Sequence, residues 1–421
     1  MSFISNNSIL PAIPYYLIVL FPVFLVNARH WGSVVFGLLL ICSLFYVRNL
    51  YLKRTWLNRN EFLYFIAFYI YFVVCIVSII FSIDVDSSLK SLEIDARYLF
   101  VPLLYVMFLS VKPSLDHISY AFIALAIVSV LFTGYEELVL SKNYGGIYSR
   151  LFTGPILTIA FIWLSAQLLF IKDKKSVYAI ILSAILIFLL ANILFIGSRS
   201  SYLVLLAVFT FLFIRVGFRN SLLLFAAFIL FIFASYFSID SFKGRIDQSI
   251  HSLDIYLEQQ NDNKARQSLS SFETRLQMAK IVKFSLSEYP ITGIGKNNYN
   301  LLADKHIKSG ELHPELAKHS HPHNAYVDVI VNQGLLGLAS ILFVFLYPLY
   351  VYIKNTRKND KLALIGTLFS ISILIFSLTE TAVLSKNNFN AVFIVLGTLF
   401  FYLYQRGDIE NEESQRIKTD K

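Results

Sequence analysis

Residues 177–196 read VYAIILSAILIFLLANILFI, a run of twenty positions without a charged side chain. A helix needs about twenty apolar residues to cross a hydrocarbon core of roughly 30 Å, because each residue advances it by about 1.5 Å. A helix also satisfies its own backbone hydrogen bonds, as lipid requires. This stretch therefore predicts a transmembrane helix.

Similar apolar runs occur on both sides of this stretch, from one end of the chain to the other. The 421-residue chain is 57% hydrophobic and only 15% charged, whereas soluble domains carry about 25% charged residues. The expected spans centre on residues 9–27, 31–47, 62–81, 98–111, 117–135, 151–170, 177–196, 202–214, 221–237, 326–353, 362–378 and 389–404. The sequence predicts an all-α polytopic membrane protein with about 12 transmembrane helices.

The charged residues lie mainly in the short connections between the apolar runs. Basic connections occur near residues 48–61, 172–176, 215–219 and 354–361. The connection at 82–97, on the opposite side, is acidic. Because Lys and Arg are enriched in cytoplasmic loops, these four connections and both termini are expected in the cytoplasm. Arg29, on the outer side, departs from this pattern.

Charge and cysteine usage exclude several classes of protein. The net charge of +9 would suit a nucleic-acid-binding protein, but charges placed in membrane loops report orientation, so no nucleic-acid partner is expected. Cys42 and Cys75 both lie inside expected spans, so no disulfide framework is implied. No basic region precedes the first apolar run, and no removable signal peptide is expected.

The longest connection, 238–325, has no spanning run. Within it, SSFETRLQMAKIVKFSL (270–286) has helical periodicity. The polar C-terminal end has mixed charge, which is typical of disorder. The sequence thus predicts four segments. They are helices 1–9 over 1–237, a large, partly helical periplasmic loop over 238–325, helices 10–12 over 326–404, and a disordered cytoplasmic tail over 405–421.

The sharpest chemical signal is HSHPHN at 319–324, followed after nine residues by GLLG at 334–337. Ser320 and Pro322 suit the start of a helix, which would place His323 in the first turn. The positive end of the helix dipole would then disfavour imidazolium, and a neutral imidazole can act as a general base. The two glycines would share a helical face with the histidine and let a neighbouring helix approach closely.

The residues of this motif also permit two different roles. The histidine can be an ordinary interfacial residue above a glycine packing face. His319, His321 and His323 also offer imidazoles that suit a metal such as zinc. Their alternate spacing across a proline disfavours such a site, so no metal is expected.

Two arginines are unusual for their positions. Arg199, in GSRSS at 197–201, follows the seventh span on the outer side, where a basic residue opposes the orientation bias. A snorkelling anchor would explain it without a function, but we favour a functional role. Arg275 shares one helical face with the apolar side chains of Phe272, Ala279, Val282 and Leu286. An arginine in an apolar stripe needs an anionic partner, either a carboxylate or a ligand phosphate.

In this order, Arg199, Arg275 and His323-Asn324 with the two glycines resemble the O-antigen ligase and polymerase family of membrane glycosyltransferases. The segment YPITGIG at 289–295 is also similar to the family's segment between its second arginine and its histidine. By motif the resemblance covers roughly residues 190–340.

Ligases of this family transfer a finished polysaccharide from undecaprenyl diphosphate to the core sugars of lipid A. They act on the periplasmic face of the Gram-negative inner membrane, without a metal or other cofactor. The resemblance therefore implies a lipid-linked polysaccharide donor, a lipid A-core acceptor and membrane lipids as partners.

The residues suit that chemistry. Departure of a diphosphate releases negative charge, which two guanidinium groups can stabilise. Direct displacement needs one base for the acceptor hydroxyl and inverts the anomeric centre. We therefore expect Arg199 and Arg275 to bind the diphosphate and His323 to act as base. Asn324 is expected to hold the histidine or a sugar hydroxyl.

Three further residues are candidates for the substrate-binding site. Arg97 follows an acidic stretch and pairs with Asp95 or Glu93, or else reaches a phosphate. Glu380, at the outer end of the eleventh span, either orients His323 or an arginine, or is an ordinary interfacial acid. Asp328, about one turn below the histidine, is a third candidate.

Three other functions compete with a ligase. An O-antigen polymerase of the same family would use the same donor chemistry, and a protein O-glycosyltransferase would use a related one. A lipid-linked sugar transporter would need charged residues near the bilayer midplane. Here the spans are almost free of charge, and the candidate residues gather at one membrane face, which disfavours transport.

Overall fold

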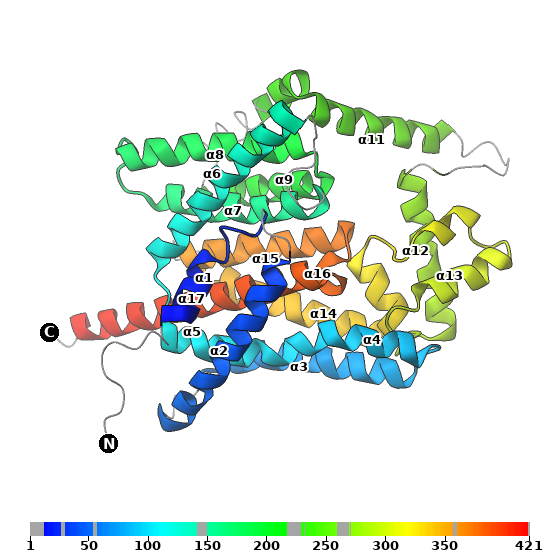
Figure 1. Cartoon of the computed structure of the whole chain (residues 1–421), viewed down its shortest axis with the longest axis horizontal. Coiled ribbons are helices and arrows are strands. Elements are labelled where there is room, and N and C mark those ends of the chain that lie inside the picture. The colour runs from blue at the N-terminus through cyan, green and yellow to red at the C-terminus, as the bar shows by residue number, and fades with distance from the viewer. Residues whose placement is uncertain are drawn as a thin grey trace.

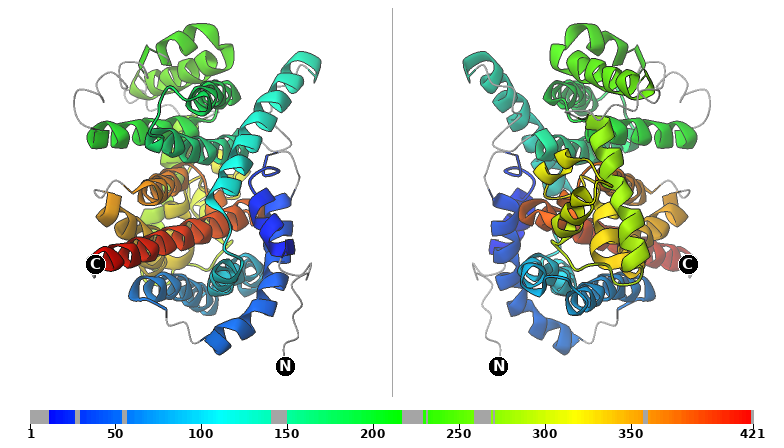
Figure 2. Two further views of the ribbon diagram at one scale, coloured as in Figure 1. Left: turned by 90° about the vertical axis from the view of Figure 1, so that its left-hand side faces the viewer. Right: turned by 90° about the vertical axis from the view of Figure 1, so that its right-hand side faces the viewer.

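The computed structural model (Figures 1 and 2) describes residues 12–26, 30–53, 57–140, 150–216, 229–230, 232–258, 269, 271–356 and 360–419. These parts are helical and contain no strand, which confirms the all-α prediction. The first half contains α1 (Ala12–Leu20), α2 (Trp31–Lys53), α3 (Arg59–Ile80), α4 (Val85–Asp95), η1 (Ala96–Phe100), α5 (Val101–Val111), α6 (Leu115–Leu140), α7 (Arg150–Phe170), α8 (Val177–Ile196) and α9 (Arg199–Val216). The second half contains α11 (Asp240–Glu258), α12 (Ser271–Glu288), α13 (Tyr299–Lys308), η3 (Pro314–Lys318), α14 (Ala325–Thr356), α15 (Lys361–Thr379), α16 (Ala382–Ser385) and α17 (Asn387–Thr419).

The described residues form eight helical stretches that are long and apolar enough to cross a membrane. They are Arg59–Ile80, Val85–Val111, Leu115–Glu136, Phe152–Phe170, Val177–Ile196, Ala325–Lys354, Lys361–Thr379 and Asn388–Gly407. Two shorter apolar helices cover Trp31–Tyr46 and Arg199–Ile214. The chain is therefore a multi-pass, all-helical membrane protein, although the expected count of 12 is not reproduced.

Four of the twelve expected spans are not among these eight stretches. The spans 31–47 and 202–214 correspond to the two shorter apolar helices, and 9–27 and 221–237 have no counterpart. The first, 9–27, contains only the nine-residue α1, which is too short to cross a bilayer. The chain turns after it, at residues 21–26, because Pro22 cannot continue the helical hydrogen bonding. Of the expected span 221–237, residues 221–228 and 231 lie outside the described residues, and the rest is helical. Residues 217–219 of the basic connection 215–219 also lie outside them.

Two segments expected to be irregular are helical. The acidic connection 82–97 contains α4, whose N-terminus is capped by the Asp84 side chain, which accepts a hydrogen bond from Ser87 N. The predicted disordered tail at 405–421 is wrong through Thr419, because α17 continues to that residue. Its Gln, Glu, Arg and Lys residues are good helix formers, and extending an existing helix needs no new nucleation.

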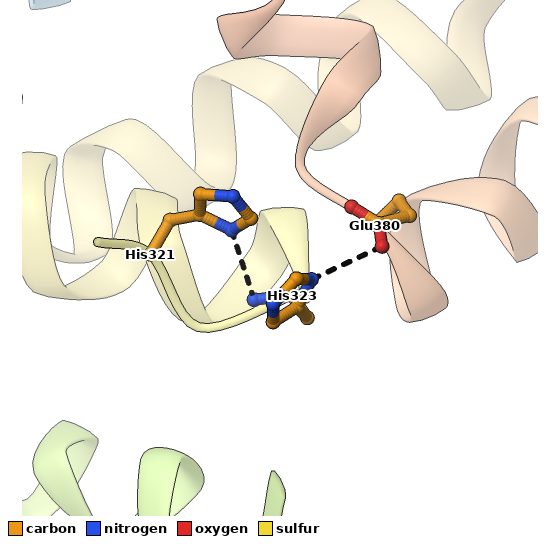
Figure 3. Close-up of side chains that lie close together, drawn as sticks. All are labelled: His321, His323 and Glu380. Carbon is orange, nitrogen blue, oxygen red and sulfur yellow. Dashed lines mark hydrogen bonds and ion pairs between the residues drawn. The ribbon is translucent and has the colours of Figure 1, made fainter. Parts of the chain in front are cut away.

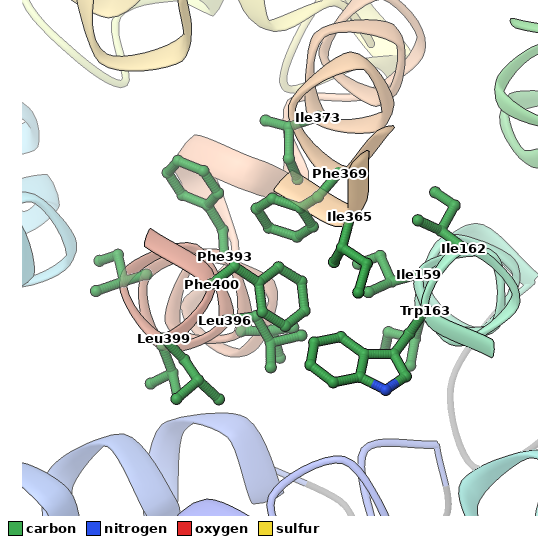
Figure 4. Packing of buried hydrophobic residues seen from close by; sticks show 14 of the residues in the cluster. Ile159, Ile162, Trp163, Ile365, Phe369, Ile373, Phe393, Leu396, Leu399 and Phe400 are labelled. Carbon is green, nitrogen blue, oxygen red and sulfur yellow. The ribbon is translucent and has the colours of Figure 1, made fainter. Parts of the chain in front are cut away.

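Aliphatic and aromatic side chains pack together inside the bundle (Figure 4). The ring of Phe400 on α17 lies 5.2 Å from Trp163 on α7 and 5.0 Å from Phe369 on α15, between ring centroids. The buried Trp163 indole donates to Ser119 Oγ at 3.1 Å, so its polar atom is satisfied. Helix α7 is thereby packed against α15 and α17, which come much later in the chain.

The long connection 238–325 is partly helical, as predicted, and contains α11, α12, α13 and η3. Helices α12 and α13 gather at one end of the bundle (Figure 1). They share a small apolar core of their own, built from Met278, Ile281, Ile294, Tyr299, Leu302, Ala303, Leu312, Leu316 and Val331. Because Val331 comes from α14, this core attaches the helical segment to the membrane bundle.

A break in α14 provides a second attachment between the long connection and the membrane bundle. Gly334 has φ 65° and ψ −161°, which no helix contains. The segment 290–295 enters the break, where Leu335 N donates to Pro290 O at 3.0 Å and Ile294 N donates to Val331 O at 3.1 Å. The prediction that this glycine serves a helix–helix contact is therefore wrong. Its missing Cβ admits another backbone, since a Cβ there would lie 2.3 Å from Ile291 O.

Candidate active site

The loop that carries the histidines ends at Asn324, directly before α14. The Asn324 side chain accepts hydrogen bonds from Tyr326 N at 2.9 Å and Val327 N at 3.1 Å, as an N-cap does. The predicted helix start at Ser320 and Pro322 is therefore wrong, because Asn324 supplies the cap. His323 lies outside the helix with φ 50°, a left-handed conformation. It projects from the loop rather than from the first turn.

His323 contacts Glu380, which lies between α15 and α16 (Figure 3). The distance from His323 Nδ1 to Glu380 Oε1 is 3.0 Å. An ionised carboxylate can only accept, so the shared proton lies on Nδ1 and the other ring nitrogen, Nε2, keeps its lone pair. A carboxylate in this place holds the imidazole in the tautomer that a general base needs.

Two more histidines lie beside His323. The ring centroids of His321 and His323 are 4.4 Å apart, and His323 N donates to His321 Nδ1 at 3.4 Å. Burial, together with the neighbouring His323, lowers the pKa of His321 to about 4. Burial and His323 also lower the pKa of His319. Both flanking imidazoles are therefore neutral at neutral pH.

The same group of side chains has a spacing that suits a metal. One potential ligand atom from each of His321, His323 and Glu380 lies within 4.8 Å of the others. Two imidazoles and a carboxylate are a common ligand set for zinc. However, His323 Nδ1 is hydrogen-bonded to the carboxylate, and His321 Nδ1 accepts from His323 N. A metal on these atoms would have to displace those hydrogen bonds.

A cavity of about 430 Å³ lies between α12, the histidine loop and the end of α15. Its volume is within the range of small-molecule sites. The lining residues are Leu269, Thr274, Arg275, Met278, Glu315, His319, His323 and Glu380. The structure thus brings Arg275, His323 and Glu380 to one cavity, although they lie far apart in the sequence.

The environment of Arg275 differs from the sequence expectation. The buried face of α12 contains Thr274, Met278 and Ser285, whereas Arg275 is exposed at the cavity. The prediction that Arg275 belongs to a buried apolar stripe is wrong, because the core beneath α12 covers the neighbouring stripe. The guanidinium is available to a ligand from the cavity side.

Arg199 begins α9, immediately after a turn in which Gly197 ends α8 with φ 77°. The hydroxyl of Ser198 lies 3.0 Å from those of both Ser200 and Ser201, and all three side chains are buried. The turn therefore holds the arginine in a fixed place. Within the described residues, its Nε is buried without a hydrogen-bond partner.

The charge of Arg199 interacts with those of Arg245 and Arg275. The two arginines expected from sequence therefore interact electrostatically, although only Arg275 lines the cavity. Sequence reasoning did not single out Arg245, which lies on α11. Nothing in its local sequence distinguishes it from other charged residues, since its interaction with Arg199 depends on the packing of α11.

Arg97 and Asp328 are not among the residues that line the cavity. The Arg97 guanidinium lies over the Phe36 ring, 5.4 Å from its centroid. The carboxylate of Asp95, an expected partner of Arg97, instead forms a buried ion pair with Lys296. Asp328 is buried and accepts from Asn332 Nδ2 at 2.9 Å. Their surroundings support structural roles.

Comparison with known proteins supports a family for this part of the chain. An uncharacterized protein from Haemophilus influenzae is 27% identical over 139 residues, which cover 32% of this chain and 33% of that protein. The match therefore spans about a third of the relative's length. A model of the O-antigen ligase family matches residues 184–342, a segment that includes Arg199, Arg275 and His323. The segment that builds most of this cavity is thus similar to the O-antigen ligase family.

Proposed function

We propose that the chain is an O-antigen ligase. In this proposal it transfers polysaccharide from undecaprenyl diphosphate to the core sugars of lipid A, on the periplasmic face of a Gram-negative inner membrane. The observation that carries the proposal is the cavity shared by Arg275, His323 and Glu380, with Nδ1 of the histidine bound to the carboxylate.

The reaction is a direct displacement at the anomeric carbon. Nε2 of His323 takes the proton of the acceptor hydroxyl, and the hydroxyl oxygen forms the new bond to the anomeric carbon. The bond from that carbon to the diphosphate breaks, and its electron pair leaves with the diphosphate. Arg275 and Arg199 stabilise the charge that develops there, and the anomeric configuration inverts.

The expected roles differ between the two kinds of residue. Arg199→Ala and Arg275→Ala should weaken donor binding and transfer together, and lysine should restore activity only in part, because it lacks the guanidinium fork. His323→Ala should keep donor binding and lose transfer by on the order of a hundred- to ten-thousandfold, which is typical of a lost general base.

The test is donor binding measured beside single-turnover transfer, for purified full-length variants in nanodiscs. Lys280→Ala is the matched control, because it removes an exposed cation from α12, outside the cavity lining. Loss of donor binding in His323→Ala, with an unchanged chemical step, would show that His323 is a ligand for the donor and not the base.

The related polymerase reaction uses the same donor. It differs only in the acceptor, which is a second lipid-linked repeat instead of lipid A-core. The complete set of motifs, Arg199, Arg275 and His323-Asn324 with the two glycines, favours the ligase. Supplying each acceptor separately to the purified protein distinguishes the two.

A further inference from the structure

Helix α11 packs against the start of α9 through one aromatic contact. The rings of Tyr202 and Phe242 meet edge to face, with centroids 5.0 Å apart, and Phe242 is buried. The Tyr202 hydroxyl donates to Leu194 O at 2.7 Å, which fixes this ring against the end of α8. The contact therefore holds α11 in a defined position beside the turn that contains Arg199.

This contact places a third arginine at the site. Arg199 lies three residues before Tyr202, and Arg245 lies three residues after Phe242. Residues three apart are neighbours on a helix surface. Each arginine is therefore about one turn from the aromatic contact, and the charge of Arg199 interacts with both Arg245 and Arg275.

Three positive charges that interact repel one another unless an anion lies between them. Within the described residues, no carboxylate forms an ion pair with Arg199, Arg245 or Arg275. The only hydrogen bond of the Arg245 side chain there is a long one, 3.5 Å, to Gln248 on its own helix.

Three carboxylates of this region have other partners. Glu315, which lines the cavity with Arg275, accepts from Leu269 N at 2.6 Å and pairs with Lys318 at 3.5 Å. Asp247, two residues after Arg245, accepts from the Tyr236 hydroxyl at 2.7 Å. Glu380 is bound to His323. A guanidinium group with free donors, beside two other guanidinium groups, is the arrangement that binds phosphate oxygens.

We propose that Arg245 is a third binding residue of the diphosphate site, acting with Arg199 and Arg275. This inference rests on the proposed function. Arg275 shares the cavity with His323, whereas Arg245 reaches the site from α11 and is not part of the cavity lining. Arg275 therefore binds the phosphate that carries the sugar, and Arg245 binds the phosphate attached to the lipid.

The ligand chemistry, a phosphate ester, has two possible sources. The lipid-linked donor carries a diphosphate, and the lipid A-core acceptor carries phosphates of its own. We assign Arg245 to the donor, because the Tyr202–Phe242 contact holds α11 against the start of α9, where Arg199 lies, and Arg199 is assigned to the donor diphosphate together with Arg275. Kinetics with the donor and acceptor varied separately distinguish the two sources.

The experiment compares Arg245→Gln and Arg245→Lys with Lys243→Gln, in full-length protein in nanodiscs. Lys243 is an exposed cation on the same helix that lies over the Tyr236 ring, 5.9 Å from its centroid, so it is the matched charge control. Loss of one charge-assisted hydrogen bond typically weakens binding on the order of ten- to a hundredfold. Arg245→Gln should raise the KM for donor by that factor, and Arg245→Lys by less. Lys243→Gln should leave the KM for donor unchanged, and none of the three variants should change the KM for acceptor.

A second measurement remains informative if Arg245→Gln folds poorly. Inorganic pyrophosphate should raise the melting temperature of the wild-type protein, as any ligand of the folded state does. It should raise that of Arg245→Lys less, whereas inorganic phosphate should have a weaker effect on both.

Several outcomes would overturn the assignment. A change in the KM for acceptor alone would place Arg245 at the acceptor phosphates. Equal donor kinetics in Arg245→Gln and Lys243→Gln, while Arg275→Ala and His323→Ala lose transfer, would remove Arg245 from the site and leave the proposed function intact. Full transfer by Arg275→Ala and His323→Ala would instead contradict the proposed function itself.

Discussion

At the scale of single residues, Glu380 determines what His323 can do. Its carboxylate lies 3.0 Å from Nδ1, opposite the nitrogen that would take the acceptor proton. When the base takes that proton, the imidazolium is stabilised by the negative charge beside it. A neutral amide in the same place gives no such stabilisation and can also present an NH2 group to Nδ1, which favours the wrong tautomer.

Glu380→Gln is therefore expected to slow single-turnover transfer, by roughly ten- to a hundredfold, part of what a general base contributes. Donor binding should be unchanged. The measurement is single-turnover transfer beside donor binding, for wild type and variant. A slower rate accompanied by weaker donor binding would leave Glu380 with a merely structural role.

The same residues predict behaviour towards metals. Both Nδ1 atoms of His321 and His323 take part in hydrogen bonds, so the group is satisfied without an ion. Transfer by purified protein should therefore persist in excess chelator. His321→Gln should keep most of the activity, because its imidazole is not assigned to the reaction. Activity lost with chelator, and restored by one divalent ion, would make His321, His323 and Glu380 a metal site.

At the scale of elements, the break in α14 joins the helical connection to the membrane bundle. The residue at 334 must have positive φ and must also admit the backbone of Ile291. In Gly334→Ala, the alanine should be strained at this φ, and its Cβ should clash with the backbone of Ile291. Strain at such a backbone position costs about 1–3 kcal/mol, and displacement of the 290–295 segment adds to it.

Gly310→Ala is the matched control for that substitution. Gly310 also has positive φ, 77°, but a Cβ there would meet nothing within 4 Å. The Gly310→Ala variant should therefore show the effect of the conformational strain alone. Thermal unfolding in detergent is expected to rank Gly334→Ala well below Gly310→Ala, with a matching loss of transfer. Equal melting temperatures would mean that the close contact with Ile291 does not matter.

These elements also show what sequence can predict. Hydrophobic runs and helical periodicity predicted α8 and α12 because both signals are local. The break at Gly334 was not predictable, because it depends on a partner segment about forty residues earlier in the chain. The prediction for Arg275 failed for the same reason. The helical face that contains Arg275 was expected to be buried, but the neighbouring face of α12 is the one that packs against the core. Arg245 needs the packing of α11, which its own sequence does not specify.

At the scale of the whole molecule, the candidate site lies at one end of several membrane helices. Arg199 follows the C-terminus of α8, His323 precedes the N-terminus of α14, and Glu380 follows the C-terminus of α15. A twenty-residue helix is about 30 Å long, so the other ends of these three helices lie on the opposite face. Those ends carry the basic connections 172–176 and 354–361.

Because basic connections favour the cytoplasm, this geometry predicts a periplasmic site. An alkaline phosphatase reporter inserted after Gly310, in the exposed turn that follows α13, should be active. A fluorescent reporter that folds only in the cytoplasm should be bright when it follows residue 174, between α7 and α8. A lipid A-core acceptor and a polymerised donor are expected only outside the inner membrane, so the orientation tests the proposed function as well as the topology. If alkaline phosphatase inserted after Gly310 is inactive and the fluorescent reporter inserted there is bright, the loop with Arg275 faces the cytoplasm. Transfer to lipid A-core is then ruled out.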